Sequence, residues 1–138
     1  MDSTGSNCRL LFDVGGTFLK AVVADSAGEL IPESEFSCPM PSDGSRDEIV
    51  GALAASVARG AAFVSSRGQT LGGLGVAFPG PFDFARGIPL MEHKFRQING
   101  LSLDDLLHGL PETGAQMPIR FMHDVNAALL GEMTRGNA

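Results

Sequence analysis

The feature that most constrains the fold is the stretch LLFDVGGTFLKAVVAD, residues 10–25, in which a carboxylate and two glycines interrupt an apolar run. Residues 8–14 and 18–25 are both typical of β-strands, and the few residues between them leave room only for a tight turn. The sequence therefore predicts a β-hairpin centred on Gly15 and Gly16. Asp13, near the end of the first strand, then lies beside that turn.

This turn has two interpretations. Asp-x-Gly-Gly is common turn chemistry, so the glycines can serve the hairpin alone. Alternatively, glycines let a polyanion approach the backbone, where consecutive N–H groups form an anion-binding concavity. Because a carboxylate repels a phosphate, a cation such as Mg²⁺ is then expected between them. The stretch alone does not decide, and the sequence contains neither G-x-x-x-x-G-K-[ST] nor a complete G-x-G-x-x-G motif.

The rest of the chain alternates strand and helix signals. A third strand is expected over residues 29–37, which completes an antiparallel meander. Ser45 to Glu48 has the form of a capping box that opens a helix, and Ile49, Leu53 and Val57 follow on one face of it. Residues 71–78 are typical of a buried strand that ends at Pro79-Gly80-Pro81.

The remaining elements are shorter. Residues 82–90, interrupted by Gly87, are consistent with a small hairpin. Ser102 to Asp105 resembles a second, weaker capping box, and the helix that it opens would have the apolar face Leu103, Leu106, Leu107 and Leu110. Residues 118–122 predict a strand, and Asp124 is placed to cap a final helix over residues 125–135. The predicted fold class is α/β, with a three-strand antiparallel meander followed by helix, strand, helix, strand and helix.

Composition excludes several function classes. The 138 residues are 43% hydrophobic and 19% charged, which is typical of one globular domain. A net charge of -6 lacks the basic surface of a nucleic-acid-binding protein. With no signal peptide and no run of about 18 apolar residues, we expect a cytoplasmic protein without a membrane span. Cys8 and Cys38 are expected to be reduced structural thiols.

Three segments together carry a resemblance to a known family. These are FDVGGTFLKAVVAD, GLGVAFPGPFD and HDVNAALLGE, in this order along the chain. They resemble three signatures of the ROK family of bacterial sugar kinases and sugar-responsive repressors: D-x-G-G-T-x-x-K, G-[IV]-x-x-P-G-P and N-D-x-N-A-A-x-x-x-E. Any one of them is a weak signal, whereas three in the family's order over nearly the whole chain are specific.

The resemblance implies the fold shared by sugar kinases, actin and heat-shock ATPases, in which two ribonuclease-H-like domains hold substrates between them. Residues 1–138 would be the amino-terminal domain, and the ATP-binding partner domain would be absent from this chain. Members of the family are about twice as long. Their adenosine pocket, and the zinc-binding cysteine cluster of many members, lie in the other half.

The same resemblance implies roles for individual residues. Asp124 would be the catalytic base that accepts the proton of the attacking sugar hydroxyl, although Asp at that position is also an ordinary helix cap. Asp13 would face Mg²⁺, and Lys20 would lie on the phosphate side or face solvent. The full set has phosphate-binding residues Gly15, Gly16, Thr17 and Lys20, and substrate-binding residues Gly80, Pro81, His93, His123 and Asp124.

One of these positions departs from the family pattern. The residue before the catalytic Asp is usually Asn, whereas this chain has His123, so the identity of the sugar stays open. A histidine can donate with one ring nitrogen and accept with the other, but it is bulkier and titrates near neutral pH. His123 is therefore either a sugar contact or a satisfied polar residue at the end of a strand.

The sequence accordingly predicts the amino-terminal half of an ATP- and Mg²⁺-dependent sugar kinase that phosphorylates a hexose or amino-sugar hydroxyl. The full-length protein would be a homodimer that binds sugar and ATP, and this fragment alone would be inactive. One alternative is the sugar-sensing domain of a ROK transcriptional regulator, but only about a dozen residues precede Asp13, too few for a helix-turn-helix. A non-enzymatic sugar-binding domain is a further alternative.

Overall fold

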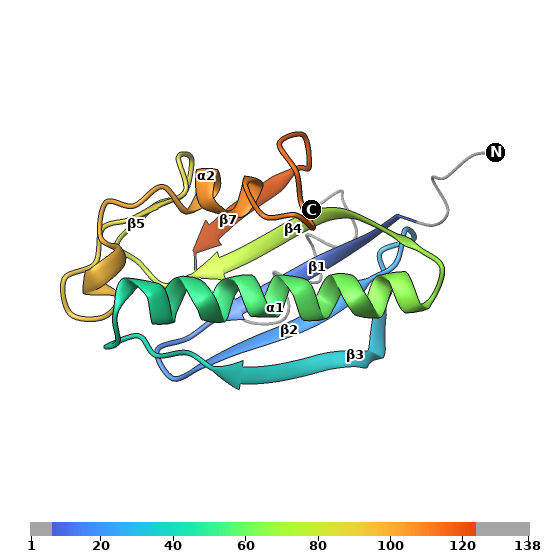
Figure 1. The fold of residues 1–138 in the computed structure, drawn as a ribbon, viewed down its shortest axis with the longest axis horizontal. Coiled ribbons are helices and arrows are strands. Elements are labelled where there is room, and N and C mark those ends of the chain that lie inside the picture. The colour runs from blue at the N-terminus through green and yellow to red at the C-terminus, as the bar shows by residue number, and fades with distance from the viewer. Residues whose placement is uncertain (1–6, 124–138) are drawn as a thin grey trace.

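A five-stranded mixed sheet organises the chain. The computed structural model describes residues 7–123, and the sheet order is β3-β2-β1-β4-β7 (Figure 1). The elements are β1 (Asn7–Val14), β2 (Phe18–Ala24), β3 (Leu30–Pro39), α1 (Arg46–Ser66), β4 (Thr70–Phe78), β5 (Phe82–Asp83), β6 (Ile88–Pro89), the short 3-10 helix η2 (Arg96–Ile98), α2 (Leu103–His108) and β7 (Ile119–His123). The predicted order is confirmed up to β7, and the predicted helix 125–135 lies outside the described residues.

The sheet combines an antiparallel meander with parallel strands. β1 and β2 pair antiparallel, as do β2 and β3, which confirms the predicted meander. β4 lies parallel to β1, and β7 lies parallel to β4. The carboxyl ends of β1, β4 and β7 therefore meet at one edge of the sheet, on the left in Figure 1.

α1 packs on one face of the sheet, and its start is the predicted capping box. The Glu48 N–H donates to the Ser45 hydroxyl over 3.1 Å, and the Glu48 carboxylate accepts from the Ser45 N–H over 2.8 Å. Ile49, Leu53 and Val57 are buried, as their spacing predicts. At Gly60 the helix comes so close to the sheet that an added Cβ would lie 2.5 Å from the Leu10 side chain.

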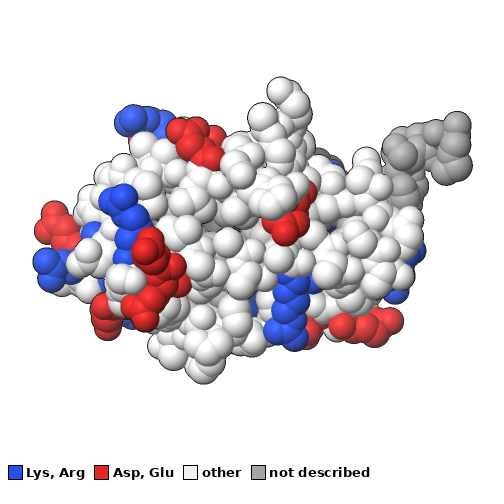
Figure 2. Space-filling model, in the orientation of Figure 1, with Lys and Arg blue, Asp and Glu red and all other residues white. Residues whose placement is uncertain are grey.

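α1 is also unusually apolar. By length and composition it could cross a membrane, with a mean hydropathy of 1.5, a criterion that core helices also meet. In this structure the helix lies along the sheet (Figure 1), and most of the surface on its side is uncharged (Figure 2). The expectation of no membrane span stays a prediction.

The core lies between α1 and the sheet. Alternate residues of β1, namely Leu10, Phe12 and Val14, are fully buried on this side. Near the carboxyl edge the core is aromatic: the Phe78 ring lies 4.9 Å from those of both Phe82 and Phe95. This aromatic cluster anchors the segment that follows β4.

The two cysteines are free thiols, and Cys8 is buried. Burial raises the pKa of the Cys8 thiol, with a further rise from the Asp25 charge. A thiol with a raised pKa is a poor nucleophile, in keeping with the predicted structural role.

α2 begins as predicted at Ser102, whose hydroxyl accepts from the Asp105 N–H over 3.1 Å. It ends at His108, whose ring ties the helix to the segment before β7. Nδ1 lies 2.8 Å from the Asp104 carbonyl oxygen, and Nε2 lies 2.9 Å from the Met117 carbonyl oxygen. Only the protonated imidazolium can donate both hydrogen bonds at once.

The protonation of His108 makes stability depend on pH. Burial alone would lower the pKa of His108, but the carbonyls of Met117 and Asp104 and the nearby carboxylates outweigh it and raise that pKa. The stabilisation of the folded state by protonated His108 is thus full below the pKa of an unfolded histidine, about 6.5, and is lost as pH rises through the raised pKa of His108 in the folded state. We expect wild type to exceed His108→Gln in Tm most at acidic pH, with the difference shrinking above neutrality. A difference that is constant between pH 5 and 9 in scanning calorimetry would contradict this assignment.

Candidate functional site

The carboxyl edge of the parallel strands gathers most of the predicted site residues. Asp13 pairs with Ala77, and Ala77 pairs with Met122, so β1, β4 and β7 end side by side. The Gly15–Gly16 turn follows β1, and the segment 79–81 follows β4. β7 ends at His123, directly before Asp124, which lies outside the described residues. Ligand sites of parallel sheets form at this edge because strand ends place backbone groups and side chains there together.

Backbone conformation does not require glycine at either position of the β1–β2 turn. Neither Gly15 nor Gly16 is among the glycines with positive φ, so the turn dihedrals do not demand glycine. A Cβ on Gly15 would lie 3.1 Å from the Phe18 carbonyl oxygen, and one on Gly16 would lie 2.6 Å from Lys94 Nζ. Backbone therefore limits the space at Gly15, whereas the neighbour at Gly16 is the flexible end of the Lys94 side chain.

Hydrogen bonds tie this turn to neighbouring segments. The Gly15 N–H donates to the Phe18 carbonyl over 2.8 Å, which leaves Gly16 and Thr17 as the turn residues whose N–H groups a phosphate could use. The Ser42 hydroxyl donates to the Gly16 carbonyl over 2.6 Å, and the Met40 N–H donates to the Thr17 carbonyl over 2.8 Å. The turn is thus held in place from the end of β3.

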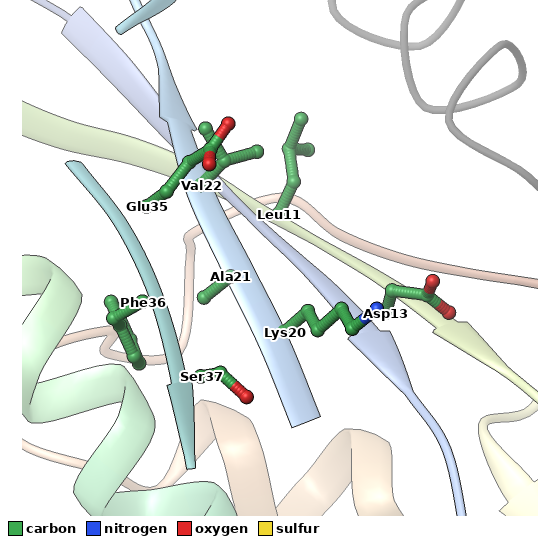
Figure 3. Close-up of a pocket in the computed structure, with 8 residues that line it drawn as sticks. All are labelled: Leu11, Asp13, Lys20, Ala21, Val22, Glu35, Phe36 and Ser37. Carbon is green, nitrogen blue, oxygen red and sulfur yellow. The ribbon is translucent and has the colours of Figure 1, made fainter. Parts of the chain in front are cut away.

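Asp13 and Lys20 lie opposite each other on β1 and β2, on the sheet face away from α1 (Figure 3). Asp13 is half-buried and Lys20 is exposed. Their side chains line a hollow of about 590 Å³, together with Leu11, Val22 and Glu35. Cross-strand pairing of opposite charges is favourable, so Lys20 has a structural neighbour as well as its predicted phosphate role.

The residues present fit a magnesium ion held mainly by substrate. The described residues contain no group of three or more His, Cys, Asp or Glu side chains that could hold a metal. Mg²⁺ commonly uses one or two carboxylates and takes its other oxygen ligands from phosphate and water. Asp13, beside the turn, supplies one such carboxylate.

Two of the predicted sugar-side residues lie together at the same edge. A Cβ on Gly80 would be 3.8 Å from His123 Nε2. The His123 ring is 5.9 Å from the Phe84 ring, and the Gly80–Pro81 peptide bond is cis. His93 is exposed in the segment between β6 and η2. The structure thus brings Gly80, in the segment after β4, together with His123 at the end of β7.

The sequence offered Lys94 only as one of three candidates for the rim of a cleft, together with Glu92 and His93, and gave it no phosphate role. Its side chain lies against Gly16, although 78 positions separate the two in the sequence. The only signal was the polar run Glu92-His93-Lys94, which was equally typical of a solvated hairpin. The Asn99 amide donates to the Met91 carbonyl over 2.6 Å and closes this loop.

Comparisons with known proteins find a family model and several solved structures that are similar to this chain. The model of the ROK family matches residues 10–138. A ROK hexokinase from Thermus thermophilus is similar at a TM-score of 0.67 and 26% identity, covering 94% of this chain and 40% of that one. A ROK family glucokinase from Streptomyces griseus, solved with glucose and AMPPNP, is similar at a TM-score of 0.66 and 27% identity, and the match covers 94% of this chain and 37% of that one.

A third structure shares the fold alone. It is a ROK family transcriptional regulator, a homologue of the E. coli MLC protein, with a TM-score of 0.72 but 14% identity, covering 96% of this chain and 32% of that one. No curated protein matches the sequence significantly.

The chain spans well under half the length of each of these three structures. Its mixed α/β sheet is the sheet of the ROK sugar kinases, as the sequence predicted. With its family model matching 129 of 138 positions, from residue 10 to residue 138, this chain belongs to the ROK family.

Proposed function

We propose that the protein containing this chain is an ATP- and Mg²⁺-dependent sugar kinase that transfers the γ-phosphoryl group to a hydroxyl of a hexose or amino sugar. The observation that carries the proposal is the meeting, at one sheet edge, of the Gly15–Gly16 turn with Asp13 and the pair of Gly80 and His123. The similarity to a glucokinase solved with glucose and an ATP analogue supports this choice of substrates.

Each side of this edge suits one substrate. The N–H groups of Gly16 and Thr17 can donate to phosphate oxygens, and Asp13 can hold Mg²⁺. Bound Mg²⁺ would offset the negative charge of the phosphates. Gly80 and His123 can border the sugar, where the His123 ring can donate to or accept from a hydroxyl. Asp124 follows His123 directly, so it can orient the attacking hydroxyl and accept its proton.

The same proposal includes the location, oligomeric state and partners of the full-length protein. We place the full-length kinase in the cytoplasm as a homodimer, with ATP and a small sugar as its partners and with no nucleic acid or membrane bound. A structural Zn²⁺, if the protein holds one, belongs to its other half. The acidic net charge of -6 supports the exclusion of nucleic acid.

The test is a phosphorylation assay with a panel of hexoses and amino sugars. We expect the full-length protein to phosphorylate at least one of them with Mg-ATP, and residues 1–138 alone to show no turnover, because the chain supplies only one side of ATP. Turnover by residues 1–138 alone would contradict the two-sided site. Sugar binding without any transfer by the full-length protein would overturn the kinase and favour a sugar-sensing role.

A further inference from the structure

We propose that Lys94 binds the terminal phosphate of ATP at the Gly15–Gly16 turn, and so shares the phosphate role that the sequence motif gives to Lys20. This inference rests on the proposed kinase function. It adds a phosphate ligand from the loop after β6, a segment that contributes no residue to the D-x-G-G-T-x-x-K pattern.

The contact between Lys94 and Gly16 is close along the whole end of the lysine side chain. A Cβ on Gly16 would lie 2.6 Å from Nζ, 3.0 Å from Cδ and 3.1 Å from Cε of Lys94. An added Cβ would meet only this flexible end of the lysine, so the contact places the Lys94 amine against the turn without itself requiring a glycine there. The lysine amine thereby reaches the turn whose backbone donors face the phosphate in the proposed kinase.

The backbone next to Lys94 is built to hold this position. Phe95 has φ 58 and ψ 28, a left-handed conformation that bulky residues rarely adopt, and its side chain is fully buried against Phe78. Its N–H donates to the Ser42 carbonyl over 2.8 Å, while the Ser42 hydroxyl donates to the Gly16 carbonyl over 2.6 Å. Ser42 therefore connects the loop of Lys94 directly to the turn. Strained residues that tertiary packing enforces in this way cluster at functional sites.

The charges at this turn suit an anion. The lysine ammonium is a positive charge, and each backbone N–H group is the positive end of a peptide dipole. Placing them close together is favourable when an anion lies between them. The ion pairs found in residues 7–123 join Arg86 to Asp83 and His108 to Asp104, and neither involves Lys94. Lysine is a common phosphate ligand because its ammonium is a compact point charge.

The two lysines of the site have different surroundings. Lys20 lies across from Asp13 and lines the hollow on the face away from α1 (Figure 3). Lys94 instead lies against the glycine turn itself. A phosphate held by the turn would therefore meet the Lys94 amine at its backbone donors, whereas Lys20 would act from the side of Asp13.

The test compares Lys94→Met with Arg96→Met in the full-length protein. Both variants remove one exposed cation from the same loop, so they change the net charge equally. We expect Lys94→Met to weaken Mg-ATP binding in isothermal titration calorimetry by about tenfold and to lower kcat/KM for ATP at least as much, with the KM for sugar unchanged. Lys94→Arg should recover part of the loss, and Arg96→Met should bind Mg-ATP like wild type.

A double-mutant cycle with Gly16→Ala adds a readout that a purely structural lysine would not give. Alanine displaces the lysine amine but keeps its charge, so its cost to Mg-ATP affinity should be smaller in the Lys94→Met background than in wild type. Fully additive costs would overturn the role of Lys94, as would a change confined to the KM for sugar.

The two proposals fail separately. Absence of sugar phosphorylation by the wild-type protein overturns the proposed function. Equal Mg-ATP affinity of wild type and Lys94→Met overturns the role of Lys94, whether or not transfer occurs.

Discussion

Replacing Asp124 by Asn in the full-length protein is expected to lower kcat by about a thousandfold or more while sugar affinity stays within about twofold. Asn keeps the size and the hydrogen-bonding reach of Asp, but its amide cannot accept the proton of the attacking hydroxyl. In the described residues β7 ends at His123, on the edge that also carries the glycine turn, and Asp124 is the next residue in the sequence.

Steady-state kinetics and calorimetric sugar binding check this prediction. Asp47→Asn is the matched control, since Asp47 is an exposed carboxylate in the first turn of α1 and should lose no activity. If the kcat of Asp124→Asn stays within about tenfold of wild type, Asp124 is not the general base, because general-base catalysis contributes about a hundredfold or more to the rate. Loss of sugar binding alone would make it a substrate ligand instead.

Replacing Phe95 by Ala is expected to destabilise the domain by about 3–5 kcal/mol, the usual cost of deleting a buried phenylalanine ring. Phe95 is fully buried, and its ring lies 4.9 Å from that of Phe78. Alanine keeps the unfavourable left-handed φ of 58 and loses the packing that enforces it. The loop should loosen, so the variant should also lose the Mg-ATP affinity that we assign to Lys94.

Native-state hydrogen exchange of the full-length protein measures this loss within the domain itself. Amides of β1 and β4 should exchange about a hundredfold faster or more in Phe95→Ala. Phe18→Ala is the control, because the Phe18 side chain is 50% exposed on β2 and its removal should cost about 1 kcal/mol or less. Equal exchange in the two variants would show that the Phe95 ring does not hold the loop.

Local patterns predicted much of the fold. The meander followed from two apolar runs separated by a glycine turn, and α1 followed from the Ser45 and Glu48 capping box. These signals are local because turn geometry and helix capping depend on residues a few positions apart. The second helix was predicted with Leu110 on its apolar face, but α2 ends at His108. There the His108 ring forms a hydrogen bond with the Met117 carbonyl, a contact that no local sequence pattern predicts.

The candidate site divides in the same way. The motifs named Asp13, the glycine turn and the segment around Gly80, and the sheet brings them to one edge as parallel strands require. The contact of Lys94 with Gly16 could not be predicted, because the two residues are far apart in the sequence and meet only through packing. Asp124 was named by its motif and stays a prediction outside the described residues.

Neighbouring positions were enough to predict the order of the elements up to β7, the family and the polar residues at the strand ends, because hydrophobic periodicity and short motifs are local. Which lysine lies against the Gly15–Gly16 turn follows only from the three-dimensional packing. Pairing of β1 with β4 and burial of Phe95 against Phe78 bring together segments that are distant in the chain, and a choice between Lys20 and Lys94 depends on that packing.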